Sequence, residues 1–213
     1  MNVDGRGISL SGLGRRRSWT GRVVGTVATL AVALLCAPPA IAAPGGLDPT
    51  FSGDGKLTTD FGSRAPEEPA AVAVQADGKA VAVGSSNGDI AVSRYNADGS
   101  LDTSFSGDGK QTTDLGGDDA AADVAVQGDG KIVVIPSSPI DASADDDFVV
   151  LRYNADGPLD TGFSGDGKQT TDFNGLGDTA TGVALQADGK IVVAGFSVNS
   201  AISNSDYDFA LAR

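Results

Sequence analysis

One block of ten residues is written three times in this chain, as LDPTFSGDGK from Leu47, LDTSFSGDGK from Leu101 and LDTGFSGDGK from Leu159. A second motif, QADGK or QGDGK, also occurs three times, and RYNADG occurs twice. Self-similarity at a spacing of roughly 55 residues is typical of a repeat architecture, in which one structural unit is copied along the chain. We therefore divide the chain into three units, at residues 47–100, 101–158 and 159–213.

The residues before the first unit resemble an export signal. A basic stretch, which includes Arg15 to Arg17, precedes an almost wholly apolar run from Val23 to Cys36, and Ala40-Ile41-Ala42 gives the small-x-small pattern of a signal-peptidase site. The apolar run is shorter than the about 20 residues of a membrane span. We predict a signal peptide at 1–42 and a secreted, extracellular or cell-envelope protein at 43–213. The general secretory and twin-arginine routes both stay open.

The remaining chain is strongly acidic. Five of the 15 Lys and Arg residues lie in the leader, but only one of the 28 Asp and Glu residues does, which leaves 10 basic against 27 acidic side chains and a formal charge of −17. This charge argues against binding to nucleic acid and to anionic membrane surfaces, because both would repel it. The sequence predicts no membrane span beyond the leader.

Each unit has the periodicity of β-strands. In the first unit, short Val-rich or Thr-rich runs at 56–61, 71–75, 80–83 and 90–95 predict four strands bounded by Gly, Asp and Asn. Asp77-Gly78 lies between the second and third runs, and an Asp-Gly pair in that place indicates a hairpin turn. No helix is predicted after the leader. The expected fold is all-β, a β-propeller-like array of three four-stranded antiparallel blades.

The segments 51–56, 188–195 and 208–213 together resemble the delta-60 repeat, a family of bacterial exported or surface proteins. The resemblance covers residues 47–213. It implies a β-propeller fold and no established general activity. Closed propellers use about four to eight blades, so three units are expected to be incomplete as a single chain. The chain is expected either to be a fragment of a longer one or to self-associate and so complete the propeller.

Several kinds of catalysis lack their residues here. The chain has no histidine, and its one cysteine, Cys36, lies in the leader, which argues against the usual zinc sites, thiol nucleophiles and haem ligation. Paired carboxylates remain, and they suffice for glycoside hydrolysis. The candidate acids recur in every unit, which favours a turn-forming role over catalysis. They are Asp54, Asp108 and Asp166 in one set, and Asp60, Asp114 and Asp172 in the other.

Calcium is the one ligand that the residues specifically suggest, and no other cofactor is predicted. Oxygen ligands alternate around a Gly turn at two equivalent places, as hard cations prefer, although neither place has the bidentate Glu of an EF-hand. A simple Asx turn explains the same pattern. These candidate ligands are Asn96, Asp98, Asp102, Asn154, Asp156 and Asp160.

Binding to a partner would be expected where the units differ. The connection before the last strand run of each unit is short at 85–89 and longer at 137–147 and 197–208, and unequal insertions on one rim often mark a binding face. We predict an exported, non-catalytic structural or binding scaffold for an unknown protein or carbohydrate. The alternatives are a carboxylate-dependent hydrolase of carbohydrate or cell-envelope polymers, and a calcium-stabilised adhesion module.

Overall fold

The computed structural model describes residues 44–137, 147–199 and 207–213. The predicted signal peptide lies outside these residues, and so does most of the two longer connections at 137–147 and 197–208. Every regular element in the described part of the chain is a β-strand, so the all-β prediction is confirmed. Among these residues no helix is long and apolar enough to cross a bilayer.

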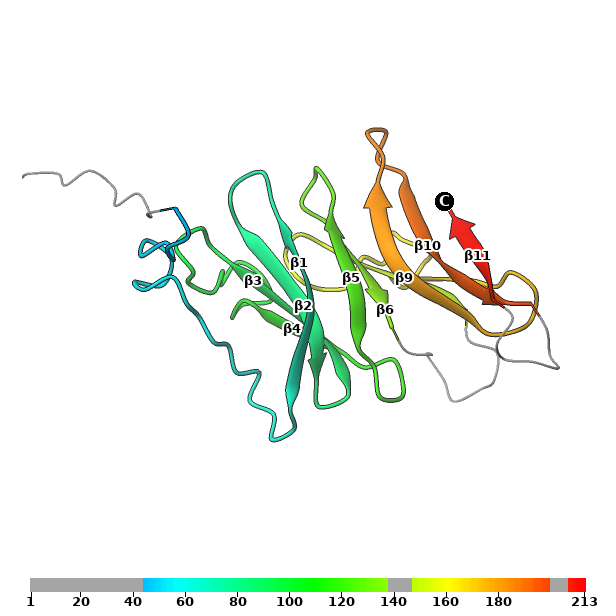
Figure 1. The fold of residues 1–213 in the computed structure, drawn as a ribbon, viewed down its shortest axis with the longest axis horizontal. Helices are drawn as coiled ribbons and strands as arrows, with labels where there is room; N and C mark the ends of the chain where they lie inside the picture. Colours follow the sequence, from blue (N-terminus) through cyan, green and yellow to red (C-terminus); the bar gives the residue numbers. More distant parts are fainter. Residues whose placement is uncertain (1–43, 138–146, 200–206) are drawn as a thin grey trace, which may run out of the picture. The chain divides into compact units, whose positions relative to one another are not determined.

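The strands form three antiparallel sheets, which Figure 1 shows in sequence order. The first sheet contains β1 (Glu67–Val74), β2 (Ala80–Ser86), β3 (Asp89–Tyr95) and β4 (Lys110–Thr113). The second contains β5 (Ala121–Val126), β6 (Ile132–Pro136), β7 (Phe148–Tyr153) and β8 (Lys168–Thr171). The third contains β9 (Asp178–Leu185), β10 (Ile191–Val198) and β11 (Tyr207–Ala212). The sheets are open and have the form of propeller-like blades of an incomplete ring.

Sheets and sequence units are out of phase by one strand. The predicted strand at 56–61 was wrong, because this segment pairs with no strand among the described residues. The physical reason is that the strand edge with which this segment would pair is already occupied. The outer strand of a sheet pairs with the third strand, and β3 already holds Lys110–Thr113 of the second unit, with Ile90 opposite Thr113 and Ser93 opposite Lys110. In the same way β8, from the third unit, completes the second sheet.

The Asp-Gly hairpins form as predicted. In the first, Gln75 and Lys79 are joined by a backbone hydrogen bond of 2.8 Å, and the Asp77 carboxylate accepts the Lys79 amide at 3.1 Å. Gly78 has a φ of 84°, a left-handed conformation that costs glycine little. The same turn joins β5 to β6 and β9 to β10. These hairpins set the register of the first two strands in each sheet.

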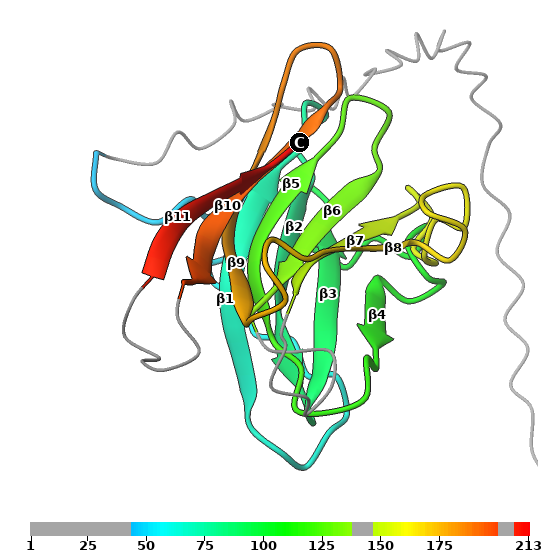
Figure 2. The same cartoon turned by 90° about the vertical axis from the view of Figure 1, so that its right-hand side faces the viewer.

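Two apolar cores lie between consecutive sheets. We call the side of a sheet that faces the next sheet along the chain its front face, and the opposite side its back face; Figure 2 shows the sheets from a second direction. The first core joins the front of the first sheet to the back of the second, and the second core joins the second sheet to the third. The first contains Val81, Ile90, Val92, Val134, Val149 and Leu151. The second contains Val133, Ile135, Phe148, Val150, Val193 and Ala210.

Candidate functional site

In its second and third copies, the repeated block forms a compact turn between the third and fourth strands of a sheet. In the second copy, the Phe105 amide donates to the Asp102 carbonyl at 2.9 Å, and the Gly109 amide donates to the Phe105 carbonyl at 2.8 Å. The serine after the phenylalanine has a positive φ in all three copies, 52° at Ser52, 51° at Ser106 and 55° at Ser164. The three blocks therefore fold alike, whatever surrounds them.

The first aspartate of this block is the centre of a charged cluster, which we call the joint. Asp102 is buried, and its Oδ2 accepts Arg94 Nε at 2.8 Å and lies 3.1 Å from Lys79 Nζ. Its Oδ1 accepts the amide and the hydroxyl of Ser104 at 3.1 and 2.7 Å. Arg94 lies over the Phe105 ring at 4.9 Å and donates at 2.6 Å to the carbonyl of Ala155, in the turn that follows β7 of the second sheet. The joint therefore ties the two sheets together.

The third copy of the block builds the same joint. Asp160 Oδ2 accepts Arg152 Nε at 2.8 Å and Lys131 Nζ at 2.7 Å, and its Oδ1 accepts the Gly162 amide at 3.0 Å. Arg152 lies over the Phe163 ring at 4.4 Å. Two joints in which the same aspartate, arginine, lysine and phenylalanine positions are in contact indicate a structural element that recurs between consecutive sheets.

Both joint carboxylates are held in their charged form. Burial raises the pKa of Asp102, but the hydrogen bonds from Ser104 and Lys79 and the charge of Arg94 together outweigh it and hold this pKa well below its usual range. At Asp160 the hydrogen bond from Lys131 is the largest cause, and it lowers the pKa against the effect of burial. A general acid needs a raised pKa, so these acids suit ion pairing and not proton donation.

The two ends of the array carry only half of a joint each. The first block has Asp48, whose Oδ1 accepts the Thr50 amide at 2.9 Å, without an arginine or lysine beside it in the described part of the chain. The third sheet has the cations instead. Lys190, which corresponds to Lys79, pairs with Asp188, and Arg213, which corresponds to Arg94, has no ion pair within the described residues.

The residues predicted to bind calcium lie in these joints and in the turns before them. Asp98 accepts the Ser100 amide and hydroxyl at 2.9 and 2.6 Å, and Asn96 donates to the Ser100 hydroxyl at 3.0 Å. Asn154 donates to the Leu159 carbonyl at 3.4 Å, and the Asp156 side chain is exposed. Asp102 and Asp160 face arginine and lysine. The structure thus divides the six residues between turns and joints, and calcium binding by them stays a prediction.

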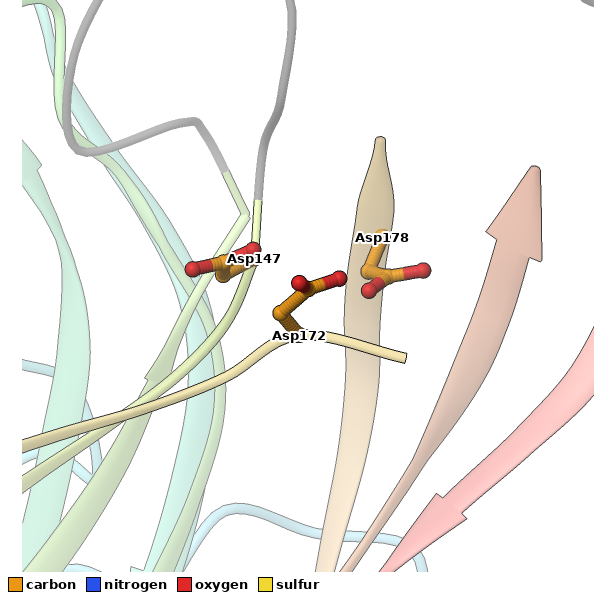
Figure 3. Close-up of side chains that lie close together, drawn as sticks. All are labelled: Asp147, Asp172 and Asp178. Atoms are coloured by element: carbon orange, nitrogen blue, oxygen red, sulfur yellow. The ribbon is translucent and has the colours of Figure 1, made fainter. Parts of the chain in front are cut away.

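A different group of acids lies close enough together to hold a cation. Asp147, Asp172 and Asp178 present carboxylate oxygens within 4.8 Å of one another (Figure 3). Asp178, at the start of β9, is 1% exposed; its Oδ2 accepts the Phe173 amide at 2.8 Å, while its Oδ1 has no hydrogen-bond partner. Asp172 accepts the amides of Asn174 and Gly175. Carboxylate oxygens are the ligands that calcium prefers.

The corresponding acid of the second unit has a perturbed pKa. Asp119 occupies the place of Asp178, is 1% exposed and accepts the Leu115 amide at 2.7 Å. Burial raises its pKa, the Leu115 hydrogen bond opposes this, and the charges of Asp114 and Asp89 raise it further. Sequence reasoning singled out Asp114 and Asp172 but missed Asp119 and Asp178. The signal was an acid at one position in every unit, with Glu67 as the first copy.

Two hollows flank the joints and the first sheet. One, of about 310 Å³, lies between the segment Lys56–Phe61 and the back face of the first sheet, beside Gly84, Ala91 and Ser93. The other, of about 420 Å³, is polar and lies beside Lys79 and Arg94 of the first joint. The polar hollow could hold a small polar ligand, while the first offers mostly apolar and hydroxyl-bearing side chains.

A family of unknown function matches this chain. The sequence profile of the beta-propeller domain of unknown function DUF5122 matches residues 75–105, 127–163 and 186–213, which together make up less than half of the chain. Each matched segment begins at the glutamine of a hairpin turn, so the match repeats with the same period as the sheets. No curated protein matches the chain significantly. The match supports a propeller-like repeat family of unknown function as the group that this chain is similar to.

Proposed function

We propose that this β-propeller repeat protein is an exported, non-catalytic scaffold of delta-60-like repeats that binds a protein or carbohydrate. One observation carries the proposal: the recurring aspartates have the same backbone partner in every copy. Asp54, Asp108 and Asp166 accept the amide two residues ahead at 3.0, 3.0 and 2.9 Å. A side chain that closes a turn in each unit is needed for folding three times, whereas a catalytic pair is needed once.

The second recurring set supports the same interpretation. Asp60, Asp114 and Asp172 each accept the amide two residues ahead, at 2.5, 2.7 and 2.9 Å. Among the described residues, the acid with a raised pKa is Asp119, which is 1% exposed, so a polymer would not reach it without local opening. A hydrolase that uses these carboxylates therefore has the weaker support.

A sedimentation assay with insoluble polymers distinguishes scaffold from hydrolase. The chain is incubated with purified peptidoglycan or with chitin, and both the bound fraction and the released reducing ends are measured. We expect binding without release. Release of reducing ends that disappears in Asp119→Asn or Asp114→Asn would overturn the non-catalytic proposal. Export is tested in parallel by mass spectrometry of the protein recovered outside the cells. Its mass should correspond to a chain that begins at Ala43.

The cluster of Asp147, Asp172 and Asp178 favours a calcium-stabilised module as the second candidate. Burial of a carboxylate oxygen without a hydrogen bond is costly, and a bound cation would remove that cost. Thermal melting with calcium and with a chelator tests this candidate. A higher Tm in calcium that is lost in Asp178→Asn supports it, and superimposable melting curves would remove it.

A further inference from the structure

The segment Lys56–Phe61 lies where the outer strand of a preceding sheet would lie. Its contacts with the first sheet repeat those that β4 makes with the second. The Ser52 amide donates to the Asp98 carbonyl at 2.7 Å, as Ser106 does to Asp156 at 2.8 Å. Thr59 Oγ1 lies 2.7 Å from the Tyr95 hydroxyl, and Thr113 Oγ1 lies 2.8 Å from that of Tyr153. The segment is therefore placed as an outer strand, yet it pairs with no strand among the described residues.

The matching edge is β11. In the first two sheets the third strand pairs with KQTT of the next unit, but β11 pairs only with β10 within the described part of the chain. Aligning DFALAR with DIAVSR and DFVVLR places Phe209 at the positions of Ile90 and Phe148. The register of the complete sheets then sets Phe209 opposite Thr59, Ala210 opposite Thr58 and Leu211 opposite Leu57.

The end faces of the array are exposed versions of its inner faces. Val72 and Val74, on the back of the first sheet, are 66% and 72% exposed, whereas Val124, the counterpart of Val72 in the second sheet, is buried. On the front of the third sheet, Phe209 is fully exposed and Leu211 is 66% exposed, whereas Phe148 is 1% exposed. Apolar side chains that are buried at equivalent inner positions but exposed side by side at the ends are typical of an interaction surface.

The sizes of facing side chains are also matched. The first core combines Ile90 and Val92 of one front face with Val149 and Leu151, whereas the second core combines the larger Phe148 with the smaller Ala210 and Ala212. If the front of the third sheet packed on the back of a first sheet, the large Phe209 and Leu211 would face the small Ala91 and Ser93.

A space for Phe209 is present on the first sheet. Phe148 packs on Gly195, where an added Cβ would lie 2.8 Å from the ring, and the counterpart of Gly195 in β2 is Gly84. Gly84, Ala91 and Ser93 line the cavity of about 310 Å³. An aromatic ring from outside would enter this cavity as Phe148 enters the second core.

The half-joints are complementary in charge. The first block supplies Asp48 and Phe51, and the third sheet supplies Lys190 and Arg213. Together they have the composition of the joint that Asp102 forms with Phe105, Lys79 and Arg94. Strand edge, apolar face and charges thus all point to one occupant, the opposite end of the same kind of array.

We propose that two copies of this chain associate head to tail, so that Lys56–Thr59 of each copy becomes the fourth strand beside β11 of the other. Two sets of three sheets then close a ring of six, within the about four to eight of closed propellers. A heterologous contact of this kind ends in a closed assembly when the rotation between copies completes the circle. The assembly is independent of whether the protein is a scaffold or an enzyme.

A charge-swap series tests the association. The full chain is measured by size-exclusion chromatography with light scattering over a concentration series, and we expect twice the mass of one chain. Asp48→Arg or Arg213→Asp alone should weaken dimerisation at least about tenfold by placing like charges together. The double variant should restore it. Asp118→Arg is the matched control, since it makes the same charge change on an exposed loop of the second unit, and it should leave dimerisation unchanged.

Cysteine pairs test the register. In the full chain carrying Cys36→Ser, Thr58→Cys with Ala210→Cys should give a covalent dimer on mild oxidation, because directly opposite residues in paired strands suit a disulfide. Thr112→Cys with Ala210→Cys is the control, because Thr112 already lies opposite Ala91 in β3. A folded chain that stays monomeric at high micromolar concentration, or a dimer that is insensitive to both single charge variants, would overturn the proposal.

Discussion

The inner joint and the first block have nearly the same sequence but opposite surroundings. Asp102 is buried among Arg94, Lys79 and Ser104, whereas the Asp48 side chain is exposed and, within the described part of the chain, is hydrogen-bonded to Thr50. The turn itself is the same in both, as the shared positive φ of Ser52 and Ser106 shows. The block thus determines its own turn through local hydrogen bonds, while the ion pair depends on what the neighbouring sheet supplies.

The largest expected difference between the inside and the ends of the array concerns two equivalent phenylalanines. Phe148→Ala should lower the free energy of unfolding by about 3–5 kcal/mol, because it leaves a cavity in the second core. Phe209→Ala should change it by less than about 0.5 kcal/mol when the chain is monomeric, since the ring is fully exposed. Urea unfolding at low protein concentration measures both. Equal losses would show that the third sheet has a buried front face.

The second comparison concerns the equivalent aspartates Asp102 and Asp48. Asp102→Asn should destabilise the fold by about 3 kcal/mol, because Arg94 would stay buried without its counter-charge. Asp48→Asn should leave the unfolding midpoint of the monomer nearly unchanged, since no cation faces it in the described residues. Chemical denaturation of the two variants side by side gives the result. A cost for Asp48→Asn as large as that for Asp102→Asn would contradict the distinction between complete and half joints.

The pH dependence of stability should separate the same two variants. The pKa of Asp102 is lowered in the folded chain, so its contribution is complete above the unfolded value of about 3.9 and is lost as the pH falls below that value. Asp119 acts in the opposite sense, because its raised pKa makes protonation favour the fold. We expect net destabilisation from pH 6 to pH 3, measured by thermal melting. Asp102→Asn should flatten this dependence more than Asp48→Asn does.

The smallest expected effect concerns two tyrosine–threonine pairs. Tyr153→Phe should cost about 1 kcal/mol, because the buried Tyr153 hydroxyl is hydrogen-bonded to Thr113. Tyr95→Phe should cost less, since its partner Thr59 lies in a half-exposed segment. Burial also raises the pKa of Tyr153 to about 12. An ultraviolet titration should therefore find one tyrosine fewer ionising near pH 10 in the wild type than in unfolded chain.

Much of the fold could be predicted because its signals are local. The Asp77-Gly78 turn and the Val-rich runs of β1 to β3 follow from turn conformation and side-chain alternation. The origin of the outer strand could not be predicted in this way. Lys56–Phe61 and Lys110–Thr113 have similar sequences, and only the available edge of β3 decides which one becomes a strand.

The candidate site was predictable only in part for the same reason. Recurrence of Asp54, Asp108 and Asp166 indicated a turn role, and their hydrogen bonds lie within two residues. The grouping of Asp147 with Asp172 and Asp178 joins distant parts of the chain, and no spacing in the sequence shows it. The same holds for Arg94 and the Ala155 carbonyl, which belong to different sheets.

The sequence by itself determined that this chain is an acidic array of repeated β units, and that each LDxxFSGDGK block closes a turn. Those properties depend on composition, periodicity and hydrogen bonds between near neighbours. Only the tertiary structure decided that the segments after the second and third blocks become the outer strands of the preceding sheets, and that the first aspartate of the block is a buried ion-pair centre in these two copies but exposed in the first. Strand pairing and ion pairing need a partner in space, and the partner comes from another unit.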